Sequence, residues 1–149
     1  MVFRESRNIS GGYVLCQRPS SHNSNPTNII MTKSIKLNND FATLIRSSRH
    51  LALVTPPSYA LSVFRLEPAD KQALDTDSLN DLNRLFYTRI SSRNDILLTR
   101  TDLNGIICIR LAVGSARTEE RHIQQAFELL CAEAELTIRA FEDAQMTAN

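Results

Sequence analysis

The sequence predicts an α+β fold, in which a small, mostly antiparallel sheet of four strands is covered by helices on one face. Three observations support this prediction. Helix-like and strand-like periodicities alternate in the order helix, two strands, helix, two strands, helix. The pair Asn104-Gly105 between two apolar runs is typical of a type I′ hairpin turn. Pairs of consecutive strands separated by helices favour a sandwich of two layers.

Composition divides the chain into a tail and one domain. Residues 1–34 contain Gly11-Gly12 and the polar run 20–25, and such a segment buries too little apolar surface to offset the entropy lost on ordering. We expect residues 1–34 to be a disordered tail. Residues 35–145 should form one domain, since 149 residues are too few for two ordinary domains.

The first half of this domain is expected to hold a helix and two strands. Apolar residues at helical spacing predict a helix over residues 34–47. Residues 51–54 form a short strand that ends at Pro56-Pro57, because consecutive prolines cannot continue a ladder of backbone hydrogen bonds. Residues 60–66 predict a second strand, apolar on both faces and therefore expected to be covered on both.

The second half is expected to hold a helix and a hairpin. A helix is predicted from Asp77 or Ser78 to about Ser92, with apolar residues along one face. Residues 96–102 and 106–113 predict the two strands of the hairpin.

A long final helix follows the hairpin. Thr118 is the expected N-cap, and Glu119 and Glu120 place negative charge in the first turn, where the helix dipole favours it. Apolar residues at helical spacing continue from Ile123 to Phe141.

Charge, hydropathy and cysteine usage narrow the function. Seventeen basic and sixteen acidic residues give a net charge of +1, so no sequence-wide field would attract nucleic acid or an anionic membrane. No apolar run approaches the ~18 residues of a membrane span, and the N-terminus lacks the apolar core of a signal peptide. Cys16, Cys108 and Cys131 have no metal-ligand spacing, which favours free thiols in a reducing compartment. We expect a cytoplasmic protein without a nucleic-acid, membrane or metal partner.

Arg110 is the candidate binding residue. Strand alternation places Ile109 and Leu111 on the core face, and Arg110 on the opposite face among small side chains. A charge in an apolar strand is unfavourable unless it is paired, and a guanidinium offers a rigid fork to a carboxylate or phosphate. From the residues alone, two interpretations stand. Arg110 binds a ligand, or it either pairs with an internal acid such as Asp102 or lies on an exposed sheet face.

The histidines and lysines form no catalytic set in the sequence. No serine, cysteine or carboxylate is placed beside a histidine as nucleophilic catalysis requires, and His122 is interpreted as a helix-surface residue. The lysines occupy the tail, a helix start and a loop, where a desolvated amine of low pKa is not expected. The residues set aside on these grounds are His22, His50, His122, Lys33, Lys36 and Lys71.

Several segments between residues 35 and 140 match one enzyme family in order and spacing. They are Val54-Thr55-Pro56-Pro57-Ser58-Tyr59-Ala60-Leu61, Val63-Phe64-Arg65-Leu66, Leu82-Asn83, Leu103-Asn104-Gly105, Ile109-Arg110-Leu111-Ala112-Val113-Gly114, Arg117-Thr118-Glu119 and His122-Ile123. In these segments the chain resembles the C-terminal part of group II pyridoxal-phosphate-dependent amino-acid decarboxylases. The aromatic-L-amino-acid and tyrosine decarboxylase branch is the most similar.

The resemblance implies a small C-terminal domain of the fold-type I class, with an antiparallel sheet covered by helices. In that family the protomer is longer, forms an intertwined homodimer and removes carbon dioxide from an aromatic L-amino acid with pyridoxal phosphate. The cofactor lysine follows a histidine in the large domain, whereas no lysine of this chain follows a histidine. The resemblance therefore implies that the chain alone binds no cofactor and holds no catalytic residue.

One binding residue is carried over from the resemblance. In related decarboxylases the arginine matched by Arg110 faces the active site and can meet the substrate carboxylate, so Arg110 is the expected substrate-binding residue. We expect a fragment of a decarboxylase that is inactive alone and whose partner is the large domain or a full-length protomer. The alternative is a non-enzymatic interaction module that docks on full-length decarboxylase protomers.

Overall fold

The computed structural model describes residues 26–69, 74–93 and 96–147. Within these ranges the element order is the predicted one. The elements are α1 (Pro26–Ser47), β1 (Leu51–Leu53), β2 (Leu61–Leu66), α2 (Thr76–Ser91), β3 (Thr99–Leu103), β4 (Ile106–Ala112) and α3 (Glu120–Thr147).

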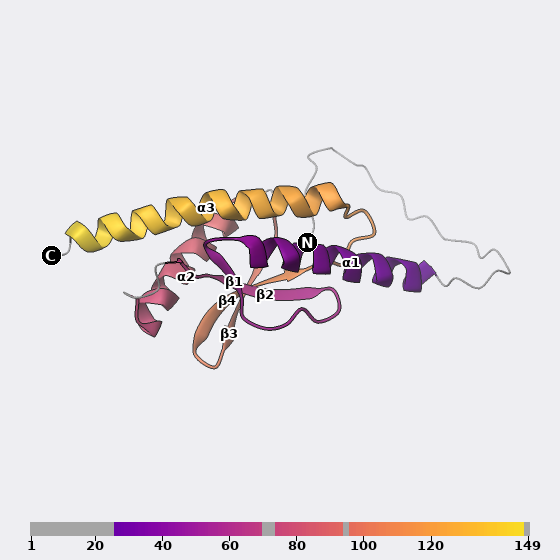
Figure 1. Cartoon of the computed structure of the whole chain (residues 1–149), viewed down its shortest axis with the longest axis horizontal. Coiled ribbons are helices and arrows are strands. Elements are labelled where there is room, and N and C mark those ends of the chain that lie inside the picture. The colour runs from indigo at the N-terminus through magenta and orange to yellow at the C-terminus, as the bar shows by residue number, and fades with distance from the viewer. Residues whose placement is uncertain (1–25, 70–73, 94–95, 148–149) are drawn as a thin grey trace, which may run out of the picture.

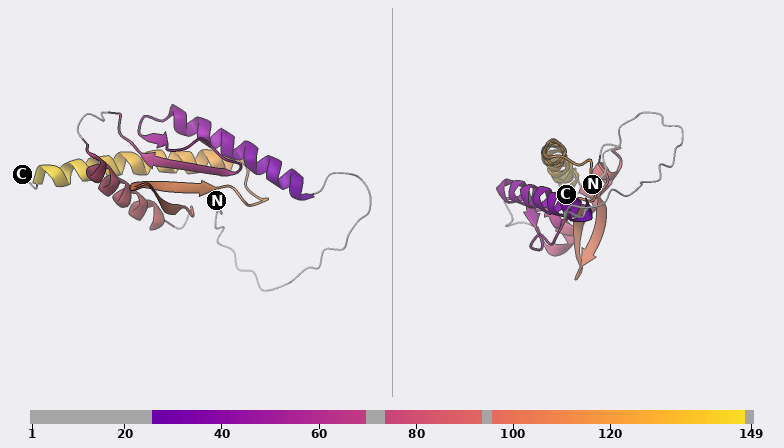
Figure 2. Two further views of the ribbon diagram at one scale, coloured as in Figure 1. Left: turned by 90° about the horizontal axis from the view of Figure 1, so that it is seen from below. Right: turned by 90° about the vertical axis from the view of Figure 1, so that its right-hand side faces the viewer.

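The four strands form one antiparallel sheet in the order β1-β2-β4-β3. Helices α1 and α2 contact the strands, and α3 packs against α1 and α2. Figure 1 shows α3 on the side of the molecule opposite to the sheet, and in the view from below the strands run in roughly the same direction as α3 (Figure 2). The predicted α+β sandwich with helices on one face of an antiparallel sheet is confirmed.

The core lies between the sheet and the helices. Phe64 of β2 is paired with Ile109 of β4, so the two side chains share the helix-facing side of the sheet. Phe41 of α1 meets the ring of Phe64 edge to face at 5.5 Å between ring centres. Other fully buried side chains from every layer complete the core, namely Ile45, Leu66, Leu82, Phe86, Ile90, Leu111, Ile123 and Leu130.

Helix α1 is longer at its N-terminal end than predicted. It begins at Pro26 instead of near Ser34, so part of the expected tail is helical, while residues 1–25 lie outside the described residues. Proline suits the first position of a helix, and extending an existing helix is far cheaper than nucleating one. The added turns leave Ile29 and Met31 more than half exposed. Because these apolar side chains are exposed, the spacing of buried apolar residues that predicted the helix did not extend to its first turns.

The prediction that β2 is covered on both faces was wrong. All helices of the described residues lie on one side of the sheet, and on the other side Leu61 and Arg65 are half-buried while Val63 is 9% exposed. Neighbouring side chains on a sheet shield one another. An apolar strand therefore does not require a second layer.

Two other boundaries differ modestly from the prediction. Strand β3 begins at Thr99, although Ile96 and Leu98 before it are buried. Helix α2 has Asp75 as its N-cap, whose side chain accepts a hydrogen bond from the Ser78 backbone amide. The apolar pattern of the sequence thus identified the strand and the helix, but it did not give the residue at which each begins.

Candidate functional site around Arg110

The turn that sets the register of the β3–β4 hairpin is the predicted type I′ turn. Asn104 and Gly105 both have positive φ, 54° and 80°. The Asp102 Oδ1 atom accepts a hydrogen bond from the Gly105 amide at 2.9 Å. Asn80 of α2 donates to the Gly105 carbonyl at 2.8 Å and accepts from the Ile107 amide at 2.9 Å. The hairpin is therefore anchored to α2, and its register decides which face each side chain occupies.

Arg110 lies on the face of the sheet that carries no helix. It is paired with Val63 on β2 and with Thr99 on β3, and its side chain is exposed. Its neighbours along the strand, Ile109 and Leu111, are both fully buried on the opposite face. The Arg110 Nε atom donates a hydrogen bond to Thr99 Oγ1 at 3.3 Å.

The suggested internal partner, Asp102, does not pair with Arg110. Asp102 is opposite Ile107, a core-facing residue, and so belongs to the other face of the hairpin. Its carboxylate accepts from the Gly105 amide. None of the ion pairs among the described residues includes Arg110. The suggested pairing with Asp102 was therefore wrong, and Arg110 lies on an exposed face of the sheet.

Arg65 and Cys108, two other polar groups on this face, are not available to bind a ligand. Arg65 is ion-paired with Glu67 at 3.0 Å between Nε and Oε2. Cys108 is fully buried, and loss of hydration raises the pKa of its thiol, which keeps it in the unreactive protonated form. Arg110 is thus the cation of this face that has no acid partner within the described part of the chain.

The described lysines do not resemble a cofactor lysine. Lys33 donates through Nζ to the Ala116 carbonyl at 3.1 Å. Lys36 is hydrogen-bonded to Glu120 and ion-paired with Asp40, and these contacts raise the pKa of its ammonium group. An exposed ammonium that is held protonated is a poor nucleophile. With these contacts, Lys33 and Lys36 do not fit covalent attachment of pyridoxal phosphate. Lys71 lies outside the described residues.

His122 takes part in the cap of α3. Its Nδ1 atom accepts a hydrogen bond from the Glu119 amide at 3.0 Å. The helix begins at Glu120, so Glu119 occupies the cap position that the sequence assigned to Thr118. Thr118 is buried just before the helix. His122 is half-buried and forms part of the helix terminus.

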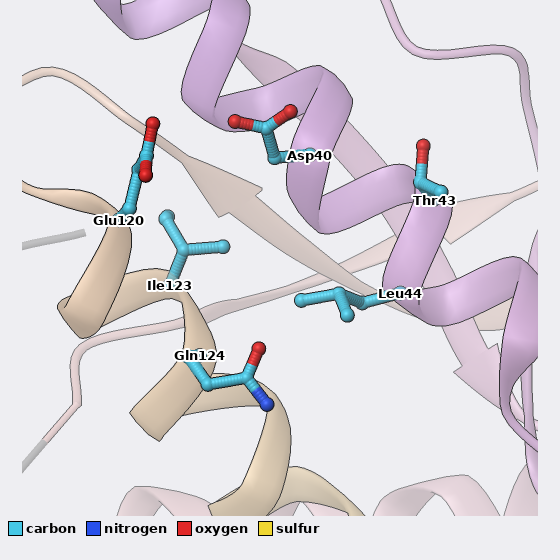
Figure 3. A pocket seen from close by; sticks show the side chains of 6 residues that line it. All are labelled: Asp40, Thr43, Leu44, Glu120, Ile123 and Gln124. Carbon is cyan, nitrogen blue, oxygen red and sulfur yellow. The ribbon is translucent and has the colours of Figure 1, made fainter.

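A shallow groove lies between the N-terminal part of α3 and the middle of α1 (Figure 3). Its rim carries two carboxylates, and Lys36 bridges them. No group of acidic, histidine or cysteine side chains in the described ranges could hold a metal ion. The groove is formed by α1 and α3 and includes no residue of the sheet face that carries Arg110. The lining residues are Asp40, Thr43, Leu44, Glu120, Ile123 and Gln124.

Thr99 is the site residue that the sequence prediction missed. The signal was present, because a two-residue turn at Asn104-Gly105 sets the register of both strands. Counting outward from the turn, Leu103 meets Ile106 and Thr99 meets Arg110. The same count places Asp102 on the wrong face to pair with Arg110.

Comparison with known proteins gives a consistent set of relatives. Phenylacetaldehyde synthase of Arabidopsis thaliana is 32% identical over 100 residues, which cover 67% of this chain and 20% of that protein. Tryptophan decarboxylase 2 of Oryza sativa subsp. japonica is 36% identical over 102 residues, covering 68% of this chain and 20% of that protein. The chain therefore spans about a fifth of the length of these relatives. No family model matches the sequence.

Solved structures share the fold. The structure of Oryza sativa TDC with PLP and tryptamine superposes with a TM-score of 0.67 at 25% identity, over 72% of this chain and 22% of that chain. The structure of Catharanthus roseus tryptophan decarboxylase in complex with L-tryptophan gives a TM-score of 0.66 at 26% identity, over 74% of this chain and 22% of that chain. No helix in the described ranges is long and apolar enough to cross a membrane.

Proposed function

The chain is related in sequence and fold to group II pyridoxal-phosphate-dependent amino-acid decarboxylases, and from this we propose that residues 35–145 act as their small C-terminal domain. The reaction is the decarboxylation of an aromatic L-amino acid. Arg110 binds the α-carboxylate of that substrate. The observation that carries this role is the exposed guanidinium on the helix-free face, without an acid partner among the described residues.

The chemistry of Arg110 suits a carboxylate ligand. A guanidinium forms two parallel charge-assisted hydrogen bonds to a carboxylate, which fix both its position and its plane. Glu67, which follows β2, is ion-paired with Arg65. Holding the carboxylate in one orientation sets the α-carbon bonds relative to the reacting group of the enzyme. A substrate clamp of this kind contributes to both binding and rate.

The 149-residue chain alone is not expected to catalyse the reaction. Loss of carbon dioxide from an amino acid needs an electron sink, which pyridoxal phosphate supplies when bound. Lys33 and Lys36 are exposed and engaged in hydrogen bonds or ion pairs. In the proposal, the large domain of a decarboxylase protomer holds the cofactor.

Spectroscopy of the isolated chain tests this part of the proposal. Addition of pyridoxal phosphate should produce no stable visible absorption band from a lysine adduct, and no carbon dioxide should be released from L-tyrosine or L-tryptophan. Arginine substitutions at Lys33, Lys36 and Lys71 serve as controls for nonspecific modification. A stable band that one of these substitutions removes would overturn the inactivity of the isolated chain.

A chimaera tests the role of Arg110. Residues 35–145 replace the matched C-terminal segment of rice tryptophan decarboxylase 2, and kcat/KM is measured for the chimaera and its variants. Arg110→Ala should lower kcat/KM by about tenfold to a hundredfold, the loss expected when a charged hydrogen-bonded pair is removed. Arg100→Ala is the matched control, because Arg100 is also exposed but lies on the helix-facing side, 5.9 Å from the ring of Tyr87. Equal kinetics for both variants would contradict the proposal.

A second function is favoured by the helix-free face itself. Leu61 and Leu103 are half-buried there, which offers an apolar surface that a decarboxylase protomer could cover. In this alternative the chain is a non-enzymatic module that docks on full-length protomers and alters the homodimer. Size-exclusion chromatography with rice tryptophan decarboxylase 2 tests it. Co-elution supports docking, whereas a monomer that elutes unchanged contradicts it.

The proposed location is the cytoplasm. Cys108 and Cys131 are free cysteines, and free thiols persist in reducing compartments. A fluorescent fusion of the chain should give diffuse cytoplasmic signal. Accumulation in the secretory pathway would contradict this location.

A further inference from the structure

We propose that Thr99 is a positioning residue for Arg110 and that it selects how the guanidinium binds a carboxylate. The hydroxyl of Thr99 occupies the Nε donor of Arg110 at 3.3 Å. This leaves the two terminal Nη groups for the ligand, so the carboxylate binds end-on to both of them and not side-on through Nε. The inference rests on the proposed substrate-binding role of Arg110.

The strand geometry supports this assignment. Thr99 and Arg110 are direct partners across the β3–β4 ladder, a relation that brings their Cβ atoms to about 5 Å. Threonine is branched at Cβ and has few χ1 states, so the strand holds its hydroxyl in place. On the other flank the partner of Arg110 is Val63, whose side chain has no hydrogen-bond acceptor. Among the described residues, the Thr99 hydroxyl is therefore the side-chain acceptor that orients the guanidinium.

The contact offers little to stability, which favours a role in binding. Both side chains are exposed, and a hydrogen bond in water exchanges with equivalent bonds to solvent. A free arginine side chain samples many rotamers, whereas one that is already oriented loses less entropy on binding. The consequence of removing the Thr99 hydroxyl should thus appear in ligand binding and in the behaviour of the Arg110 Nε–H group.

Nuclear magnetic resonance on the isolated chain tests the positioning directly. The exchange rate of the Arg110 Nε proton with water is measured in the wild type and in Thr99→Val, which keeps the side-chain shape and removes the acceptor. The exchange rate should rise by about threefold to tenfold in Thr99→Val, as expected for loss of a hydrogen bond of ordinary strength. Thr99→Ser, which retains the hydroxyl, should restore the wild-type rate.

Thr101→Val is the matched control for this measurement. Thr101 lies two residues along β3, on the same face as Thr99, but its partner is Cys108. This variant should leave the exchange of the Arg110 Nε proton unchanged. Equal exchange rates in wild type, Thr99→Val and Thr101→Val would overturn the positioning role.

Kinetics of the chimaera separate this inference from the proposed function. Thr99→Val should lower kcat/KM by about threefold to tenfold through KM, and Thr99→Ser should recover it. If Arg110→Ala lowers kcat/KM while Thr99→Val does not, the positioning role alone fails. If Arg110→Ala has no effect, the substrate-binding role fails, and the Nε exchange data still decide whether Thr99 orients the guanidinium.

Discussion

At the scale of single residues, two side chains occupy left-handed backbone for different reasons. Asn104 has a φ of 54° in the hairpin turn, a position that asparagine tolerates. Tyr59 has a φ of 51° although it is bulky and 76% exposed. Its carbonyl accepts a hydrogen bond from the buried amide of Asn38 at 3.2 Å, and Asn38 accepts in turn from the Ser62 hydroxyl. A buried polar contact therefore maintains the strained backbone of Tyr59.

Relief of this strain is predicted for Tyr59→Gly. Left-handed backbone destabilises a residue with a Cβ by about 1–2 kcal/mol. Glycine avoids this strain, but it lowers the stability of the fold by about 0.5–1 kcal/mol because the unfolded chain gains conformational entropy. The variant should be more stable by about 0.5–1 kcal/mol in urea unfolding, since Tyr59 buries little surface. Asn104→Gly is the control and should gain less. A net loss of stability in Tyr59→Gly would contradict strain at this position.

At the scale of elements, buried asparagines join the helices to the sheet. Asn83 of α2 accepts from the Leu66 amide at 2.8 Å and donates to the Leu66 carbonyl at 2.9 Å. Its amide group also donates to the Leu79 carbonyl of its own helix at 2.8 Å. Asn80 makes the equivalent link to β4, and Asn38 links α1 to the start of β2. These links fix the position of each helix relative to the strands.

Loss of one such link should be costly. Asn83→Ala leaves buried backbone groups of Leu66 without their side-chain partner, and we expect a loss of about 2–3 kcal/mol in the free energy of unfolding. Asn39→Ala, at an exposed position of α1, is the control and should change stability by less than about 0.5 kcal/mol. Equal effects of the two substitutions in urea unfolding would show that the Asn83 contacts do not stabilise the fold.

The N-cap of α2 makes stability dependent on pH. Ser78 donates to the Asp75 carboxylate from its side chain and from its backbone amide, the latter at 2.8 Å, and these hydrogen bonds lower the pKa of Asp75 below its ordinary 3.8. A lowered pKa in the folded state means that this cap stabilises the protein above pH 3.8 and that the contribution is lost as the pH falls through the folded pKa.

Asp75→Asn provides the test, because asparagine keeps an acceptor at the cap and does not titrate. The melting temperature of the wild type minus that of the variant should decrease as the pH is lowered from about 6 to about 2. All other acids titrate in both proteins, so the difference isolates the cap. A difference that is independent of pH would contradict the assigned role of Asp75.

At the scale of the whole molecule, α3 closes the core over α1 and α2. Leu130, in the first half of this helix, is fully buried. Glu133 follows on the buried side and accepts from Arg89 at 3.2 Å and from Arg93 at 2.8 Å, which ties α3 to α2 and the residues just after it. The C-terminal helix is therefore part of the folding unit.

Removal of one core side chain of α3 should weaken the whole domain. Leu130→Ala is expected to lower the free energy of unfolding by about 2–5 kcal/mol, through lost burial and the cavity left behind. Leu136→Ala, 46% exposed on the same helix, is the matched control and should lower it by less than about 1 kcal/mol. Similar losses for both variants would mean that α3 does not pack as described.

The sequence by itself determined the features that depend on neighbours along the chain. The element order, the hairpin turn and the face of Arg110 follow from local periodicity and from the conformational preference of Asn104-Gly105. The missed Thr99 contact also belongs here, since the hairpin register was already implied by that turn.

Only the tertiary structure decided the features that join distant segments. The bonds of Asn83 to Leu66 and of Asn80 to Ile107 depend on where a helix lands on a strand. The helix-free face around Arg110 likewise follows from the described helices packing on one side of the sheet. Residue spacing records which side chains share a face, but it contains no information on what covers that face, because the cover comes from segments far away along the chain.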